Sequence, residues 1–425
     1  MTTDVTTDGT TDVTTALASP VPDDRPAHRD PNVLRWLGGF TASAVGDNVY
    51  YIALSWAAVQ SGTAAQAGLV TAVSAVPRAL LMLGGGVAAD RYGPRRVVVG
   101  STAVRSALVL TAAVLLLVTS PGLWALGAVA VLFGVVDAVF IPAAGALPAR
   151  ITGRSQLTRV QGMRGLATRL ANVLGGPLGG LGVALGGTAG AFGLAALLIG
   201  VSLPVLLAVR VGELPPDEQK ARGAVSAELR DGLRHIRRDR VLRPLIVVIA
   251  LGDLGFVGPL NIGLTLLSEE RGWGSGGMGW VLAGFGVGAG SAALLLTWRG
   301  RLPRAGYVMA VTNAASAVAI AGLAQAPSVL AAVGVALCVG MLAGLAGALG
   351  TALVQAAAGP AYVGRVTSAA TLVSYGVAPL TFPLVGWAIG QWGTGPVFTA
   401  CAGVCALSGA VALCAGPLRR AELPV

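Results

Sequence analysis

The sequence predicts an all-α membrane protein in which twelve transmembrane helices form two six-helix bundles. Hydrophobic residues make up 54% of the 425 residues and charged residues only 11%, which is far from the composition of a soluble domain of this length. A bilayer core of about 30 Å needs about 20 apolar residues in a helix. Twelve stretches meet this requirement, at residues 36–59, 66–88, 97–118, 122–146, 167–186, 189–209, 244–267, 277–298, 306–325, 328–354, 366–391 and 395–416.

The basic residues predict the orientation of these spans. Of the 29 Lys and Arg residues, all but Arg78, Arg105, Arg169 and Arg271 lie in the two tails or in the connections that follow even-numbered spans. Loops rich in Lys and Arg remain in the cytoplasm. We therefore expect a multi-pass protein of the cell's inner (plasma) membrane with both termini in the cytoplasm.

The net charge of +10 is explained by the same distribution. The arginines are spread over separate segments next to the membrane, whereas a nucleic-acid-binding protein gathers them on one face. No nucleic-acid partner is expected.

The domain organisation follows from the spans. Residues 1–32 are rich in Thr and Asp and are expected to form a disordered cytoplasmic tail. Bundles at 33–210 and 244–416 flank a cytoplasmic linker at 211–243, and 417–425 form a second cytoplasmic tail.

The linker contains apolar residues at helical spacing, namely Val225, Leu229, Leu233 and Ile236. This spacing predicts an amphipathic helix on the cytoplasmic face of the membrane. A solvated linker helix is the alternative.

The two bundles resemble each other in sequence. Gly46 and Asp47 in the first span correspond to Gly252 and Asp253 in the seventh. This repeat indicates two halves related by duplication in the same orientation.

The connection between the second and third spans carries a distinctive set of residues: Gly86, Asp90, Arg91, Gly93, Arg95 and Arg96. A tight turn at the membrane surface needs Gly93, and Asp90 is suitably placed to face the positive end of a neighbouring helix, with Arg91 beside it. We expect Arg95 and Arg96 to set topology rather than to act in a switch.

This loop resembles the signature loop of the major facilitator superfamily, with Pro94 as an extra residue. The resemblance extends over residues 33 to 416 and implies the major facilitator fold and a loop that stabilises one access state by contacting the eleventh helix. Further similarity to the twelve-helix efflux branch of macrolide and enterobactin exporters lies in Gly46–Asp47, Val76–Pro77–Arg78, Arg105, Ile141–Ala144 and Gly364–Ser368.

The fifth span resembles the antiporter motif of drug exporters. The residues concerned are Gly176, Pro177, Gly179 and Gly180, with one residue instead of two between the proline and the glycine pair. The fourth span lacks the arginine that many drug:proton antiporters carry there, so their proton mechanism does not transfer directly.

Charged residues inside the spans mark the candidate site, because each costs roughly 3 kcal/mol at mid-bilayer. The candidates for proton coupling or the substrate cavity are Asp47, Asp253, Asp137, Arg78 and Arg105. Burial favours the protonated carboxyl, and a nearby arginine favours the ionised form. Our hypothesis is that Asp47, with Arg78 or Arg105, is the principal proton-linked site and Asp253 the second. The alternative is a fixed buried ion pair that holds helices together.

The sequence therefore predicts a secondary transporter that exports small amphipathic organic molecules, drugs or secondary metabolites, by proton antiport with alternating access. A siderophore or other metabolite exporter is the alternative, followed by a nutrient importer and a non-transporting sensor.

We expect a functional monomer with substrate, protons and the bilayer as partners. Catalytic residues, metal and cofactor are not expected, because the only histidines, His28 and His235, lie outside the spans and the four cysteines form no CxxC pair.

Overall fold

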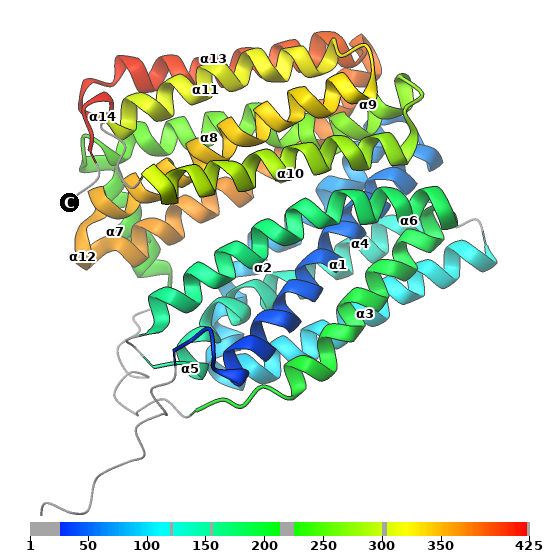
Figure 1. The fold of residues 1–425 in the computed structure, drawn as a ribbon, viewed down its shortest axis with the longest axis horizontal. Coiled ribbons are helices and arrows are strands. Elements are labelled where there is room, and N and C mark those ends of the chain that lie inside the picture. The colour runs from blue at the N-terminus through cyan, green and yellow to red at the C-terminus, as the bar shows by residue number, and fades with distance from the viewer. Residues whose placement is uncertain (1–25, 120–121, 154–155, 213–224, 300–303, 423–425) are drawn as a thin grey trace, which may run out of the picture.

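The computed structural model describes residues 26–119, 122–153, 156–212, 225–299 and 304–422. The described part of the chain contains helices and no strands (Figure 1). The N-terminal helices are α1 Pro31–Ser61, α2 Ala64–Tyr92, α3 Pro94–Val118, α4 Leu123–Ala146, α5 Pro148–Ile151 and α6 Leu157–Leu207. They are followed by α7 Val225–Arg238, α8 Leu242–Gly258, the π-helical turn η3 Pro259–Gly263, α9 Leu264–Glu270, α10 Gly274–Arg299, α11 Ala305–Ala324, α12 Val329–Trp392, α13 Thr394–Cys414 and α14 Gly416–Arg419.

Glycine breaks divide the two longest helices. Helix α6 has 51 residues and breaks at Gly186 and Gly187. Gly187 has a φ of 63°, a conformation that favours glycine. Helix α12 has 64 residues and breaks at Gly359, with φ of 66°. Both breaks fall where the sequence predicts a connection between spans.

Ten helical stretches of the described chain are long and apolar enough to cross a membrane. One of them, Arg159–Leu207, contains the break in α6, and α1 is not among the ten although it has 31 residues. If the two parts of α6 are counted separately and α1 is added, the ten stretches are compatible with the twelve crossings that the sequence predicts.

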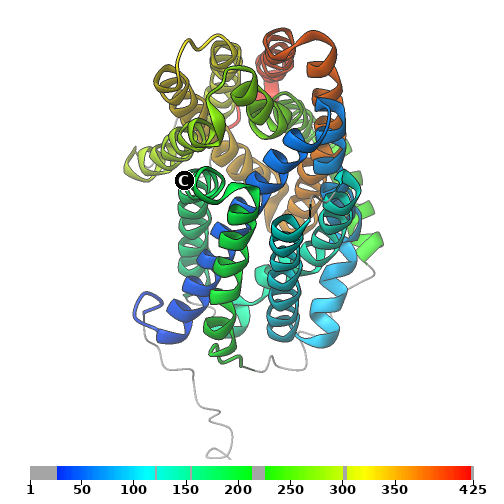
Figure 2. The same ribbon diagram turned by 90° about the vertical axis from the view of Figure 1, so that its right-hand side faces the viewer.

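The helices form two bundles, α1 to α6 and α8 to α13. The C-terminal bundle lies above the N-terminal bundle in both Figure 1 and Figure 2. We call the end that carries the connections at 61–64 and 270–274 the outer end, following the orientation that the arginines predict. The inner end, with α5, α7 and α14, lies at the left of Figure 1.

The apolar cores differ between the two ends. Toward the outer end one cluster of buried residues runs through both bundles and includes Leu54, Phe133, Leu267, Phe382 and Phe398. At the inner end each bundle has a cluster of its own, built around Trp36, Phe40, Phe140 and Leu206 in one and around Leu242, Leu245, Met309 and Leu353 in the other. In the part of the chain that the structure describes, the bundles therefore share a core only toward the outer end.

Small residues form the seam between the bundles. Between α2 and α12, a Cβ added to Gly386 would lie 2.5 Å from the carbonyl oxygen of Ala64, and one added to Gly68 would lie 2.5 Å from that of Phe382. The backbones approach this closely because the residues lack side chains.

The seam also runs between α6 and α10, and the glycine-proline motif of the fifth span lies there. Gly176 and Gly180 are four residues apart and face α10, where a Cβ on Gly180 would lie 2.6 Å from the carbonyl oxygen of Ser275. Gly179 faces Ile52 of α1 instead, and Pro177 lies inside the helix. Arg169, one of the four basic residues outside the tails and the connections after even-numbered spans, donates a hydrogen bond of 3.0 Å to the carbonyl oxygen of Ala289 across the seam.

The predicted linker helix is present as α7, and it packs against protein. The His235 ring stacks on Tyr362 of α12 at 4.3 Å, Ile236 is buried, and Gly232 lies against the backbone of Arg365. The side chains of residues 225–229 lie outside what the structure describes, as do residues 213–224. Helix α7 is thus docked on the inner end of the C-terminal bundle, a position that neither expectation for the linker contained.

Part of the expected N-terminal tail is also attached to the bundle. Asp30 caps α1, and Asn32 exchanges two hydrogen bonds with the backbone of Arg210, of 2.7 and 2.8 Å. Residues 1–25 and 423–425 lie outside the described chain.

We predict that Gly386→Leu weakens the outer seam and shifts the protein toward an outward-open state, because a side chain there meets the backbone of α2. In a background without the native cysteines, the rate at which an impermeant thiol reagent labels Ser55→Cys from outside should rise about tenfold. Gly403→Leu is the matched control, since a Cβ at Gly403 meets nothing within 4 Å. Equal labelling rates in the two variants would contradict the account of the seam.

Candidate functional site

A cavity of about 470 Å³ lies between the two bundles. Its N-terminal wall is formed by Asn48, Tyr51, Ile52, Ser55, Thr71, Ser74, Arg78, Asn172 and Gly176. Its C-terminal wall is formed by Asp253, Phe256, Val257, Leu260, Asn261, Leu264, Thr265, Met278, Leu282, Phe285, Ser374, Tyr375 and Phe382. The cavity therefore has one mainly polar wall and one mainly apolar and aromatic wall.

The π-helical turn η3 helps to shape this cavity. It interrupts the seventh span at Pro259, and Leu260 and Asn261 from this turn line the cavity. Asn261 donates through Nδ2 to the carbonyl oxygen of Val257, at 2.8 Å. Such turns frequently occur at functional sites, because they re-aim side chains within a helix.

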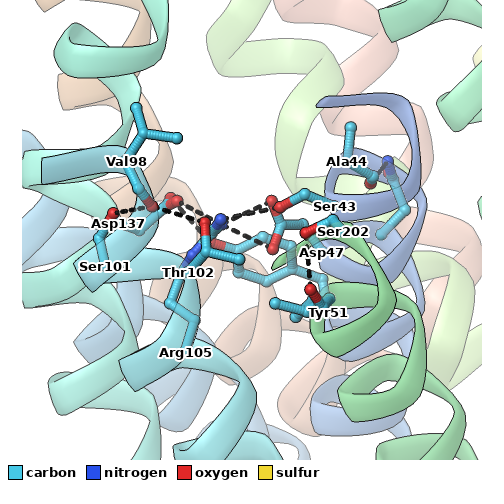
Figure 3. Close-up of polar contacts among 12 residues, drawn as sticks. Ser43, Ala44, Asp47, Tyr51, Val98, Ser101, Thr102, Arg105, Asp137 and Ser202 are labelled. Carbon is cyan, nitrogen blue, oxygen red and sulfur yellow. Dashed lines mark hydrogen bonds and ion pairs between the residues drawn. The ribbon is translucent and has the colours of Figure 1, made fainter. Parts of the chain in front are cut away.

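Beside the cavity, four charged side chains of the N-terminal bundle form one network, of which Figure 3 shows the part around Arg105. Nη1 of Arg105 on α3 donates to both carboxylate oxygens of Asp47 on α1, at 2.8 and 2.7 Å. The same nitrogen is 3.4 Å from Oδ1 of Asp137 on α4. Arg105 thus lies between two carboxylates from two other helices.

The surroundings of Arg105 fix its position. Its side chain is fully buried, Nη2 donates to Oγ of Ser43 at 2.8 Å, and the guanidinium lies 3.6 Å from the ring centroid of Phe140. Nε has no hydrogen-bond partner among the residues that the structure describes. A charge so deeply buried is tolerated only when it is paired, so Arg105 depends on its two carboxylates.

The network continues from Asp137 to the cavity through Arg78 on α2. Nη1 of Arg78 is 3.6 Å from Oδ2 of Asp137 and donates to the Tyr51 hydroxyl at 2.8 Å. The Tyr51 hydroxyl in turn lies 3.5 Å from Oδ2 of Asp137. The Arg78 guanidinium also lies over the ring of Tyr375 at 5.3 Å, and Tyr375 belongs to the C-terminal bundle.

The order of the network is therefore Asp47, Arg105, Asp137, Arg78. It is formally neutral, with two positive and two negative groups. Solvent reaches mainly its two ends, since the side chains of Asp47 and Arg78 are 18% and 15% exposed, against 0% for Arg105 and 7% for Asp137. Protonation of either carboxylate would leave an uncompensated guanidinium in a buried site, which is costly.

The structure brings four of the five predicted intramembrane residues together and leaves the fifth apart. Asp253 lies on the opposite wall of the cavity, in the C-terminal bundle, within hydrogen-bonding reach of Ser374. Asp47 is held by Arg105 and does not line the cavity, so the two pseudo-equivalent aspartates occupy different environments.

Sequence reasoning missed the neutral members of the site. Tyr51 could have been found, because it lies four residues after Asp47 and hence on the same face of α1. Asn48 and Asn172, joined by a hydrogen bond of 3.3 Å, and the aromatic Tyr375 carry no such signal in the sequence.

The signature loop lies at the inner end, away from the cavity. Gly93 has a φ of 84°, which explains the need for glycine at the turn. Arg91 is exposed and lies over the ring of Tyr92, whereas Arg95 donates to the carbonyl oxygen of Leu207 at the end of α6, at 2.6 Å. Gly86 lies within α2, and Arg96 is exposed on α3. The side chain of Asp90 lies outside what the structure describes, so its predicted contact with the eleventh helix stays a prediction.

With this architecture established, comparison with known proteins assigns the family. The model of the Major Facilitator Superfamily matches residues 36–383. The chain belongs to this superfamily and is a transporter of that class.

A more particular relative is the multidrug efflux pump Tap. The proteins from Mycobacterium tuberculosis and Mycobacterium bovis are each 30% identical to this chain over 236 residues, which cover 52% of the chain and 54% of the relative. The match thus spans about half the length of these relatives.

Solved structures confirm the fold. The nucleoside transporter NupG aligns with a TM-score of 0.68 at 12% identity, over 90% of this chain and 98% of its own. A variant of the peptide transporter POT with sulfate aligns with a TM-score of 0.70 at 14% identity, over 92% and 96%. A bacterial homologue of the lysosomal transporter Spinster, in an inward-facing and unoccupied conformation, gives 0.68 at 14% identity, over 94% and 97%.

We predict that Arg105→Leu destabilises the protein by about 3 kcal/mol or more, because Asp47 loses its arginine partner and Asp137 loses one of its two. The second substitution Asp47→Asn should recover part of this loss, since it removes one of the stranded charges. Thermal unfolding in detergent measures both effects, with Arg159→Leu, an exposed arginine of α6, as the control. Strictly additive losses in the double variant would show that Arg105 and Asp47 do not interact.

Proposed function

We propose that the chain exports small amphipathic organic molecules in exchange for protons, through alternating access of the central cavity. The observation that carries this proposal is the joint position of the cavity and the charged network. Arg78 belongs to both, and it reaches the C-terminal bundle through Tyr375.

Three features support export of amphipathic molecules. The efflux pump Tap is a relative over half of its length. A cavity of about 470 Å³ suits a small organic molecule, and its C-terminal wall offers the apolar surface that such a molecule needs. The bundles share an apolar core toward the outer end and have separate cores at the inner end, which supports loading from the cytoplasm.

The charges of the cavity favour a substrate with a positive group. Among the described residues no cation pairs with Asp253, whereas Arg78 is already paired with Asp137. Phe256 lines the same cavity, and an aromatic ring attracts a cation. An anionic metabolite, including an anionic siderophore, would meet the uncompensated Asp253 and is less suited.

Proton coupling would use the order of the network. Uptake of a proton at Asp47 weakens its hold on Arg105, and Arg105 then pairs more fully with Asp137. Asp137 in turn holds Arg78 less tightly, so that a change in protonation at Asp47 reaches the cavity and the contact between Arg78 and Tyr375. Alternating approach of the bundles can follow because Arg78 touches both of them.

The central test of this function is proton release from liposomes. Purified protein is reconstituted with a pH-sensitive dye and exposed to a panel of lipophilic cations and neutral amphiphiles. The wild-type protein should exchange protons for substrate, whereas Asp47→Asn should bind substrate and lose this exchange. Unchanged coupling in Asp47→Asn would sink the proposal that Asp47 is the proton-linked group.

A second prediction concerns substrate charge. Asp253→Asn should weaken binding of monovalent lipophilic cations about tenfold and leave neutral analogues within about twofold, because only the cation loses a charge partner. Binding is measured by quenching of intrinsic tryptophan fluorescence. Phe256→Leu is the companion variant, which should weaken both classes of ligand. An equal loss for cations and neutral analogues in Asp253→Asn would contradict the charge argument.

A further inference from the structure

A second charged feature lies outside the central cavity, at the inner end of the C-terminal bundle. It is a groove of about 420 Å³ located where α7 ends and α8 begins. Four arginines line it: Arg237, Arg238, Arg240 and Arg243. Neither the cavity nor the charged network of the N-terminal bundle uses these residues.

The arginines of this groove have no ion-pair partner among the described residues. All four are exposed, and the structure gives none of them an ion pair within the described chain. The one carboxylate in the groove is occupied, because Oδ1 of Asp239 accepts hydrogen bonds from the backbone N–H groups of Val241 and Leu242, at 2.8 and 2.7 Å. Asp239 therefore caps α8 rather than pairing with the arginines.

One side of the groove is apolar. Pro244 and Val247 from α8 face Val411 of α13 across it, and Val247 is 45% exposed. These residues lie at the start of Leu242–Glu270, a stretch long and apolar enough to cross a membrane. The arginines thus lie at the depth of the lipid headgroups, and the apolar wall continues toward the acyl chains.

We propose that this groove binds the phosphate headgroup of an anionic phospholipid. Guanidinium groups bind phosphate oxygens in a bidentate manner, and a basic groove beside membrane-spanning helices matches an anionic headgroup. Free phosphate would satisfy the arginines but would leave Pro244, Val247 and Val411 without a ligand. A lipid satisfies both sides and supplies an anionic partner that the four arginines do not have among the described residues.

The bound lipid would also connect the linker to the membrane. Arg237 and Arg238 belong to α7, whereas Arg243 belongs to α8, so one phosphate contacts both elements. Helix α7 is held on its other side by the stack of His235 on Tyr362. Lipid and protein together then hold the linker helix at the inner end of the C-terminal bundle.

The test titrates the purified, fluorescently labelled full-length protein in detergent with short-chain phosphatidylglycerol and with short-chain phosphatidylcholine, using microscale thermophoresis. The wild-type protein should bind phosphatidylglycerol more tightly. Arg240→Gln/Arg243→Gln should raise the Kd for phosphatidylglycerol by about tenfold or more and leave that for phosphatidylcholine within about twofold.

The matched control is Arg96→Gln/Arg159→Gln, which removes two exposed arginines from the N-terminal bundle. It should change the Kd for phosphatidylglycerol less than twofold, with both variants unfolding at the wild-type temperature. An equal rise in both variants would overturn the proposal, because binding would then reflect net charge alone. Binding of inorganic phosphate as tight as that of phosphatidylglycerol, and weakened as much by Arg240→Gln/Arg243→Gln, would also overturn it, because the apolar side of the groove would then contribute nothing and the site would be one for free phosphate.

Discussion

The structure of the N-terminal bundle depends on the Arg105 guanidinium, which is fully buried between Asp47 and Asp137. A charge in this position is stable only while its carboxylates are present, and each carboxylate comes from a different helix. Arg78 extends the same chain of charges to a fourth helix. Helices α1 to α4 are therefore held together by one neutral group of four charges, and any change in protonation acts on all four helices.

The contacts between the two bundles are of a different kind. Glycines face the backbone of the opposite bundle across the seam, namely Gly68 and Gly386 between α2 and α12, and Gly180 between α6 and α10. The shared apolar core lies toward the outer end as well. Contacts between small residues have no strong directional preference, so they can separate without leaving buried charges unpaired. Arg78 is the member of the charged network that reaches the opposite bundle. Through its contact with Tyr375, Arg78 could transmit a change in protonation of the network to the relative position of the two bundles.

Much of this fold could be predicted from the sequence, because spans and their breaks are local properties. Apolar stretches, arginine-rich connections and positions such as Gly359 are visible without tertiary contacts. The sequence left open whether Asp47 lies beside Arg78 or Arg105, since Asp47 and Arg105 are 58 residues apart and meet only through the packing of α1 against α3. The docking of α7 and the place of Tyr375 depend on contacts between distant segments. The aspartates of the duplicated halves, alike in sequence, differ because Asp47 pairs with Arg105 whereas Asp253 has no arginine partner in the part of the chain that the structure describes.

The central claim is that a carboxylate of the buried network changes protonation when substrate binds. Infrared difference spectroscopy of the reconstituted protein, recorded on addition of substrate, measures this directly through the stretching band of a protonated carboxyl group. The account predicts a band that disappears on substrate binding in the wild-type protein and that is absent in Asp47→Asn. A band of unchanged intensity in Asp47→Asn would contradict the account, because a carboxyl group other than Asp47 would then carry the proton.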